Sequence, residues 1–301
     1  MNTSANTQLR TTSLIAWAAT LIASILPEIF FDQAGGGIPD WLFWAKMGLF
    51  GALLVLSLIW RLLRPLSSFF AVWVVLLGAT ELAGNLNFNL SVVQKWLGNG
   101  SFVRTMQPLQ LSKLAVTTAV LIVLALFGKT RKQLFLTPGH LAAPITPVKW
   151  MGFPKPDSWW SFGGQYGIYI PLGMALVMWL TSRPSPQAME RVLPLLPVIL
   201  LFAALNALNE ELALRASLLA ALEPAIGTQA AWWMSALFFG IAHFYGVPYG
   251  WTGILLATFN GWLLGKAMVE TRGLAWAWWM HFLQDVAIFI FLAARAITPG
   301  G

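Results

Sequence analysis

The sequence has no cysteine and few charged residues. The absence of cysteine among 301 residues excludes disulfides, thiolate metal ligands and a cysteine nucleophile. Asp, Glu, Lys and Arg together make up only 10% of the chain, against roughly a quarter in soluble domains. Hydrophobic residues make up 58%, so a water-soluble globular protein is excluded.

Long apolar runs occupy most of the chain. Runs of about 20 residues, the length that crosses the hydrocarbon core of a bilayer, predict nine candidate spans: 12–31, 41–60, 66–84, 109–128, 164–181, 192–222, 229–244, 251–268 and 273–296. The alternation typical of strands is absent, and open sheet edges are not tolerated in lipid. We therefore predict an all-α, polytopic transmembrane helical bundle with about eight to nine spanning helices.

Basic residues outnumber acidic ones by 18 to 11 and lie mostly between the apolar runs. This distribution favours a role in orientation and in contact with anionic lipid, so we expect the bilayer as a partner and no nucleic acid. The densest basic cluster is Lys129, Arg131 and Lys132. The positive-inside rule predicts that this cluster and the N-terminus are cytoplasmic. We expect an integral protein of a bacterial-type cell membrane whose first span is retained rather than cleaved as a signal peptide.

A polar, proline-containing stretch divides the chain. We expect an N-terminal membrane portion of about four helices over 1–128, a cytoplasmic linker over 129–163 and a second membrane portion over 164–301. No internal repeat relates the two membrane portions.

Charged side chains inside a bilayer cost several kcal/mol unless they are paired or solvated, so each one marks a candidate functional site. Four in the N-terminal portion are scattered, and we interpret them as helix-end residues or interhelical pairs: Glu28, Lys46, Glu81 and Lys113. The C-terminal portion holds a denser polar set on four successive helices: Glu210, Glu211, Arg215, His243, Asn260, His281 and Asp285.

Spacing and depth bring this polar set together. Glu211 and Arg215 are four residues apart, as are His281 and Asp285, so each pair shares a helix face. Adjacent glutamates point about 100° apart, so only one can aim squarely at a given centre. At about 1.5 Å per residue, the members of the set lie roughly 12 to 21 Å from the cytoplasmic helix ends. A buried hydrogen-bond network that only fixes packing is the alternative, and convergence at one depth argues against it.

Two carboxylates and two imidazoles can activate water, either directly or on a metal, and then protonate a leaving amine. No serine flanks the set, and the zinc-binding HExxH motif is absent. Metal ligation through Glu211, His243 and His281 stays open, because spacing alone does not decide it.

Three motifs carry a resemblance to a known family. Glu210-Glu211-Leu-Ala-Leu-Arg215 matches EExxxR, Phe239-Gly-Ile-Ala-His243 matches FxxxH, and His281-Phe-Leu-Gln-Asp285 matches HxxxN with Asp in the last place. Their order and helix placement resemble the CAAX-protease and bacteriocin-processing (CPBP) family of intramembrane proteases, over about residues 190–296. The family includes type II CAAX prenyl endopeptidases.

The resemblance implies a helical bundle with a catalytic cavity inside the membrane that opens toward the cytosol. It implies that Glu210 is the general base that activates water, assisted by His243. Glu211 and Arg215 would support its position and charge, and His281 would line the oxyanion site. The resemblance does not decide between a glutamate protease and a metalloprotease that uses a divalent metal such as zinc.

Asp285 departs from the asparagine of the family motif. An ionised Asp cannot donate a hydrogen bond to an oxyanion, so Asp285 is either protonated there or orients His281 instead. Burial and the neighbouring glutamates favour the protonated form.

The sequence therefore predicts an endopeptidase that hydrolyses membrane-associated peptide or protein substrates, prenylated CAAX-type substrates among them. A non-catalytic immunity or scaffold protein of the same family is one alternative, and a proton-coupled transporter is another. A transporter usually shows repeated halves or paired broken helices, which this sequence lacks, and no motif residue expected of the enzyme is missing.

Overall fold

The computed structural model describes residues 3–98 and 100–297. Within these ranges the chain is helical, and the only β pairing consists of two isolated bridges, Pro144 with Ser158 and Val148 with Phe153. The helices are α1 (Thr3–Ala23), α2 (Leu26–Gln33), α3 (Trp41–Ile59), η1 (Arg64–Leu66), α4 (Ser67–Asn85), α5 (Ser91–Leu97), α6 (Ser101–Leu126), η2 (Lys149–Met151), α7 (Trp159–Ser182), α8 (Pro186–Val192), η3 (Leu193–Leu195), α9 (Leu196–Glu210), η4 (Glu211–Ala216), α10 (Ser217–Ile226), α11 (Thr228–Ile241), α12 (Trp251–Thr271) and α13 (Ala275–Ile297).

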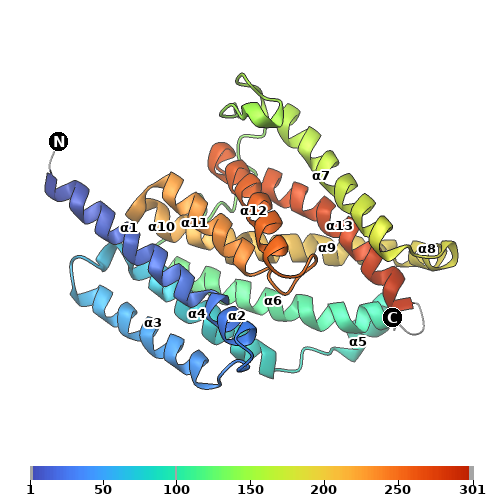
Figure 1. Ribbon diagram of the computed structural model, residues 1–301, viewed down its shortest axis with the longest axis horizontal. Coiled ribbons are helices and arrows are strands. Elements are labelled where there is room, and N and C mark those ends of the chain that lie inside the picture. Colours follow the sequence, from blue (N-terminus) through green and yellow to red (C-terminus); the bar gives the residue numbers. More distant parts are fainter. Residues whose placement is uncertain (1–2, 99, 298–301) are drawn as a thin grey trace.

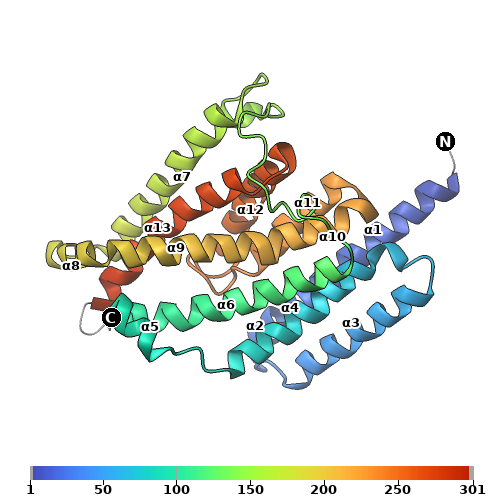
Figure 2. The ribbon, with the colours of Figure 1, turned by 180° about the vertical axis from the view of Figure 1, so that it is seen from behind.

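The long helices lie side by side in the order α3, α4, α6, α9, α13 and α7, and each packs on the next (Figures 1 and 2). The helices α11 and α12 form a tight pair that packs on α10 and α13. The helix α9, whose last residue Glu210 begins the EExxxR motif, therefore lies between α6 of the N-terminal portion and α13 of the C-terminal portion.

Five helical segments are long and apolar enough to cross a membrane: Trp41–Ile59, Arg64–Asn85, Ser101–Leu126, Pro186–Ile226 and Ala275–Ala296. The bent pair α1 and α2, with an angle of 49° between its members, makes a sixth if it is one span. The chain is thus a polytopic helical membrane protein, but the expected eight to nine spans are too many. The helices α7, α11 and α12 form where they were predicted. However, α11 has only 14 residues, and glycine, tryptophan and polar side chains lower the mean hydropathy of α7 and α12.

The polar stretch before α7 is anchored to the turn between α12 and α13. His140 N–H donates to Thr271 O at 2.8 Å, and Leu274 N–H donates to Thr137 O at 2.9 Å. Gly139 and Gly273 approach so closely that a Cβ on either one would collide with backbone atoms of the other. These contacts fix residues 137–140 against the C-terminal helices.

The largest buried apolar cluster draws side chains from both membrane portions. Trp73 of α4 meets Phe238 of α11 edge to face, with ring centroids 4.9 Å apart. The N-terminal helices therefore pack on the helices that carry the motifs, and the division at 128 and 163 stays a prediction.

Candidate active site within the membrane bundle

The EExxxR motif crosses a change of helix type. The helix α9 ends at Glu210, and η4 (Glu211–Ala216) is a π-helical turn that leads into α10. Such turns occur frequently at functional sites. Within the turn, Glu211 and Arg215 are completely buried and form an ion pair, as their spacing predicted.

His281 of α13 lies between the two adjacent glutamates. Its Nδ1 is 2.7 Å from Glu211 Oε1, and its Nε2 is 3.6 Å from Glu210 Oε2. We expected only one glutamate to aim at a given centre. Each approaches a different nitrogen of the same ring instead, at hydrogen-bond distance for Glu211 and beyond it for Glu210. Because a carboxylate oxygen accepts hydrogen bonds, the contact with Glu211 fixes a proton on Nδ1.

Asp285 joins this group from the next turn of α13. Its Oδ2 lies 3.7 Å from His281 Nε2 and accepts a hydrogen bond at 3.0 Å from Asn206 Nδ2. Asn206 Nδ2 also donates to Glu210 Oε1 at 3.2 Å. Our sequence reasoning missed Asn206, although its position one helical turn before Glu210 was a signal that it shares a face with that glutamate.

The FxxxH motif holds a second imidazole at the end of α11. His243 Nδ1 is 2.7 Å from Phe239 O. Because a carbonyl only accepts hydrogen bonds, Nδ1 carries a proton and Nε2 is the acceptor of the neutral ring. The Phe239 ring lies 4.3 Å from the His243 ring, 5.9 Å from the His281 ring and 4.7 Å from the Arg215 guanidinium carbon. The Phe239 ring thus packs against both imidazoles and the guanidinium.

Close packing of α12 supports the position of His243. A Cβ at Gly253 would lie 2.9 Å from His243 O and would collide with Pro248 O, so only glycine permits this approach of helix and loop. Asn260 of α12 was expected in the polar layer. Its Oδ1 is buried without a partner, and within residues 3–98 and 100–297 no hydrogen bond joins its side chain to the carboxylates.

Lys113 of α6 completes the group from the N-terminal portion. Its Nζ donates to Glu210 Oε1 and to Asn206 Oδ1, at 2.6 Å in each case. We had interpreted Lys113 as one of several scattered charges. The missed signal is a polar stripe in an apolar helix, because Gln110, Lys113 and Thr117 follow a spacing of three and four residues and share one face.

The other N-terminal charges behave as expected. Lys46 Nζ lies 2.6 Å from Glu28 Oε2 and also donates to Ser24 O at 2.6 Å. This interhelical pair ties α3 to the bend between α1 and α2. Exposed Glu81 accepts a hydrogen bond from Asn85 at the end of α4.

A divalent metal of the zinc type would need three protein ligands that converge on one point. In the described part of the chain, no three His, Asp or Glu side chains are arranged to hold a metal ion. Nδ1 of His281 is engaged by Glu211, and Nδ1 of His243 by a backbone carbonyl. Both contacts leave Nε2 free, so the histidine tautomers are compatible with either kind of protease. Because no three ligands converge in the described residues, no step below passes through a metal.

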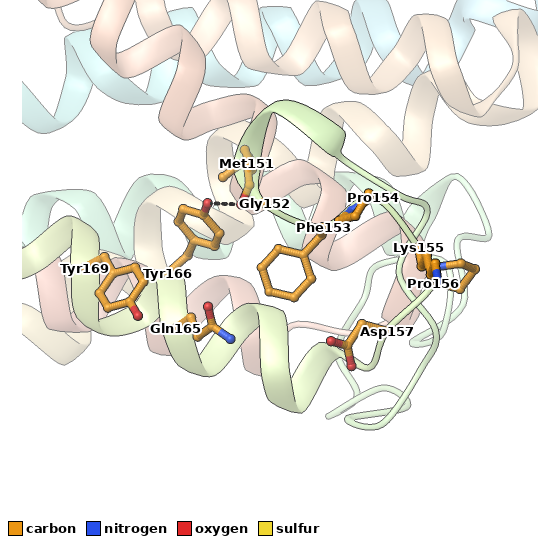
Figure 3. Close-up of a pocket in the computed structure, with 10 residues that line it drawn as sticks. All are labelled: Met151, Gly152, Phe153, Pro154, Lys155, Pro156, Asp157, Gln165, Tyr166 and Tyr169. Atoms are coloured by element: carbon orange, nitrogen blue, oxygen red, sulfur yellow. Dashed lines mark hydrogen bonds between the residues drawn. The ribbon is translucent and has the colours of Figure 1, made fainter.

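A pocket of about 400 Å³ lies elsewhere, between residues 151–157 and the first half of α7 (Figure 3). A hydrogen bond joins two of its lining residues, from Tyr166 O–H to Met151 O at 2.6 Å. None of the ten lining residues belongs to the polar group, so this pocket and the candidate active site are separate.

One comparison with known proteins covers the helices that carry the three motifs. No curated protein and no solved structure matches the chain. The family model described as Type II CAAX prenyl endopeptidase Rce1-like matches residues 192–287. The matched segment contains all three motifs, from Glu210 to Asp285, and excludes α6. Residues 192–287 of this chain are therefore similar to the Rce1-like type II CAAX prenyl endopeptidases.

Proposed function

We propose that the protein is an intramembrane endopeptidase that hydrolyses peptide bonds of membrane-associated substrates, prenylated CAAX-type peptides among them. The observation that carries the proposal is the convergence of Glu210, Glu211 and Asp285 on His281 within the segment that the family model matches. Carboxylates and an imidazole in a site protected from bulk water are suited to water activation and proton transfer.

Glu210 rather than Glu211 is the general base. The Glu210 side chain is 13% exposed, whereas Glu211 is completely buried and committed to Arg215 and His281. Oε1 of Glu210 is held by Lys113 and Asn206, which leaves Oε2 to accept a proton from water. As that water forms a bond to the scissile carbonyl carbon, its proton passes to Glu210 and then to the leaving amine as the C–N bond breaks.

The second imidazole assists this proton transfer. His243 and His281 pack against the same Phe239 ring, and Nε2 is the nitrogen through which His243 accepts or passes a proton. In the protonated form, His281 donates from Nε2 toward the space between Glu210 and Asp285. A protonated Asp285 would be a second donor, so the two groups are suited to stabilise an oxyanion that develops there.

The orientation follows from the basic cluster at Lys129, Arg131 and Lys132. We infer that this cluster and the N-terminus are cytoplasmic, in a cell membrane of the bacterial type. The site would then act on peptides near the cytoplasmic face.

The test is cleavage of a membrane-peptide library by the purified full-length protein in lipid nanodiscs, with products identified by mass spectrometry. We expect Glu210→Gln to lower kcat by roughly 10² to 10⁴, the usual contribution of a positioned general base. Glu81→Gln, at an exposed carboxylate remote from the motifs, should leave kcat unchanged. Wild-type turnover in Glu210→Gln would refute the assignment.

A chelator is included as a separate arm of this assay. We expect turnover to persist after treatment with the chelator, because the described residues do not form a three-ligand site. Loss of turnover that added zinc restores would replace the glutamate mechanism with a metal-dependent one.

A further inference from the structure

The helices within residues 192–287, which the family model matches, bring more carboxyl groups than permanent cations to the site. Glu210, Glu211 and Asp285 are three carboxyl groups, and Arg215 is the one permanent cation near them on those helices. Arg215 is committed to Glu211. Glu210 and Asp285 are therefore left without a permanent cation on these helices, inside a bilayer where an uncompensated charge costs several kcal/mol.

Lys113 supplies the missing positive charge from outside the matched segment. Its ammonium group lies 2.6 Å from Glu210 Oε1 and 2.6 Å from Asn206 Oδ1. Asn206 in turn donates to both carboxylates, at 3.2 Å to Glu210 and 3.0 Å to Asp285. Lys113 and Asn206 thus form one bridge that contacts both carboxylates.

Packing between α6 and α9 fixes this bridge in place. Gln110 Nε2 donates to Asn206 Oδ1 at 3.2 Å, and Asn209 Nδ2 donates back to Gln110 O at 3.4 Å. Thr117 Oγ1 donates to Asn209 O at 3.4 Å. These hydrogen bonds hold the turns of α6 before and after Lys113 against α9. The side chain of Lys113 therefore points into the bundle, unlike a lysine that extends to the membrane surface.

We propose that Lys113 is a positioning residue of this active site, which holds Glu210 in orientation and compensates the charge of Asp285 when that carboxyl group is ionised. The proposal rests on the proposed endopeptidase activity. The ammonium fixes Oε1 of Glu210 and leaves Oε2 directed toward water and His281. On this proposal, Lys113 supplies the positive charge that Asp285 requires in place of the asparagine of the family motif. The N-terminal portion of the chain then contributes a residue to the active site.

The activity test compares Lys113→Met and Lys113→Arg in the full-length protein in nanodiscs. Lys113→Met should lower kcat at least about tenfold with little change in KM, because the ammonium acts on Glu210 rather than on the substrate. Lys113→Arg retains the charge and should recover most of kcat. Arg272→Met removes a cation from an ion pair of 2.7 Å with Glu223 that contacts none of the site residues, and it should leave kcat unchanged.

If Lys113 acts by balancing charge, a second substitution that removes a carboxylate should restore part of the kcat lost in Lys113→Met. A lysine that only supports packing would not show this recovery. Adding Asp285→Asn to Lys113→Met removes the additional carboxylate together with its cation, and kcat should rise relative to Lys113→Met alone. Wild-type kcat in Lys113→Met, no recovery in Lys113→Arg, or a further fall in the double variant would each overturn the proposal.

A second readout separates this proposal from the proposed function. Wild-type cleavage that Glu210→Gln abolishes supports the endopeptidase, whatever Lys113 does. If the wild type cleaves nothing, the function fails, and unfolding of the two single variants and the double variant in mixed micelles still tests the charge balance. We expect the effects of Lys113→Met and Asp285→Asn on the unfolding equilibrium to be non-additive by about threefold or more. Additive effects would refute the coupling.

Discussion

Replacing Arg215 with methionine leaves a buried carboxylate without its counterion. Arg215 and Glu211 are both completely buried, and they pair across the π-helical turn between α9 and α10. Methionine fills a similar length of space with no charge. The variant therefore isolates the electrostatic loss from the packing loss.

The expected cost is large because neither charge has access to solvent. Removing one partner of a buried ion pair costs about 3 to 5 kcal/mol. The guanidinium also lies 4.7 Å from the centre of the Phe239 ring, a desolvated contact of about 2 kcal/mol. Part of that contact is kept as sulfur–aromatic packing, so we expect Arg215→Met to lower the free energy of unfolding by about 4 kcal/mol.

The assay is equilibrium unfolding in mixed micelles, read by tryptophan fluorescence and circular dichroism. A change of about 4 kcal/mol shifts the unfolding equilibrium nearly a thousandfold, since each 1.4 kcal/mol is tenfold. The matched control is Arg272→Met. Arg272 pairs with Glu223 at 2.7 Å, but its side chain is 54% exposed, so its loss should cost less than about 1 kcal/mol.

The double variant Arg215→Met/Glu211→Gln tests the cause of this loss. It removes both charges and should be more stable than Arg215→Met alone, because no uncompensated carboxylate remains. Equal losses for Arg215→Met and Arg272→Met, or a double variant less stable than either single variant, would refute the reasoning.

Two further predictions concern position 285 and the orientation of the chain. Asp285→Asn should keep much of the activity near neutral pH if a protonated Asp285 is the donor to the oxyanion, and pH–rate profiles of the variant and the wild type would test this; a variant inactive at every pH would mean that Asp285 acts as an anion. Because the chain has no cysteine, single cysteines at exposed His140 and Gln187 can be labelled separately with an impermeant thiol reagent. Reagent outside the cell should reach residue 187 and not residue 140, and the reverse pattern would overturn the cytoplasmic linker.

Contacts within one helix could be predicted from the sequence. The pairing of Glu211 with Arg215 follows from four-residue spacing, and His281 and Asp285 lie on one face, although 3.7 Å separates their nearest atoms. The predicted convergence at one depth is found for Glu211, His281 and Asp285, because several charges buried in a bilayer are tolerated only when they contact one another. These results need only helix geometry and the cost of an isolated charge in lipid.

Contacts between helices could not be predicted in the same way. Lys113 and Glu210 are 97 residues apart, and their meeting depends on how α6 and α9 are rotated against each other. Mean hydropathy does not determine that rotation. Only the few polar side chains on each helix mark the facing surfaces, and their spacing does not say which other helix each surface meets. The structure supports five or six apolar spans because α11 has only 14 residues and the mean hydropathy of α7 and α12 is low.

The π-helical turn between Glu211 and Ala216 amounts to an α-helix with one additional residue. Upstream, α9 must present Asn206 and Glu210 toward α6 and α13, while downstream α10 packs on α11, α4 and α1. Each residue in an α-helix turns the chain by about 100°, so the additional residue sets the rotational phase between these two surfaces. Deleting one residue from 212–214 would rotate one surface against the other by about that angle. A single-residue change in length can therefore inactivate the site while every glutamate, histidine and arginine of the motifs remains in the sequence.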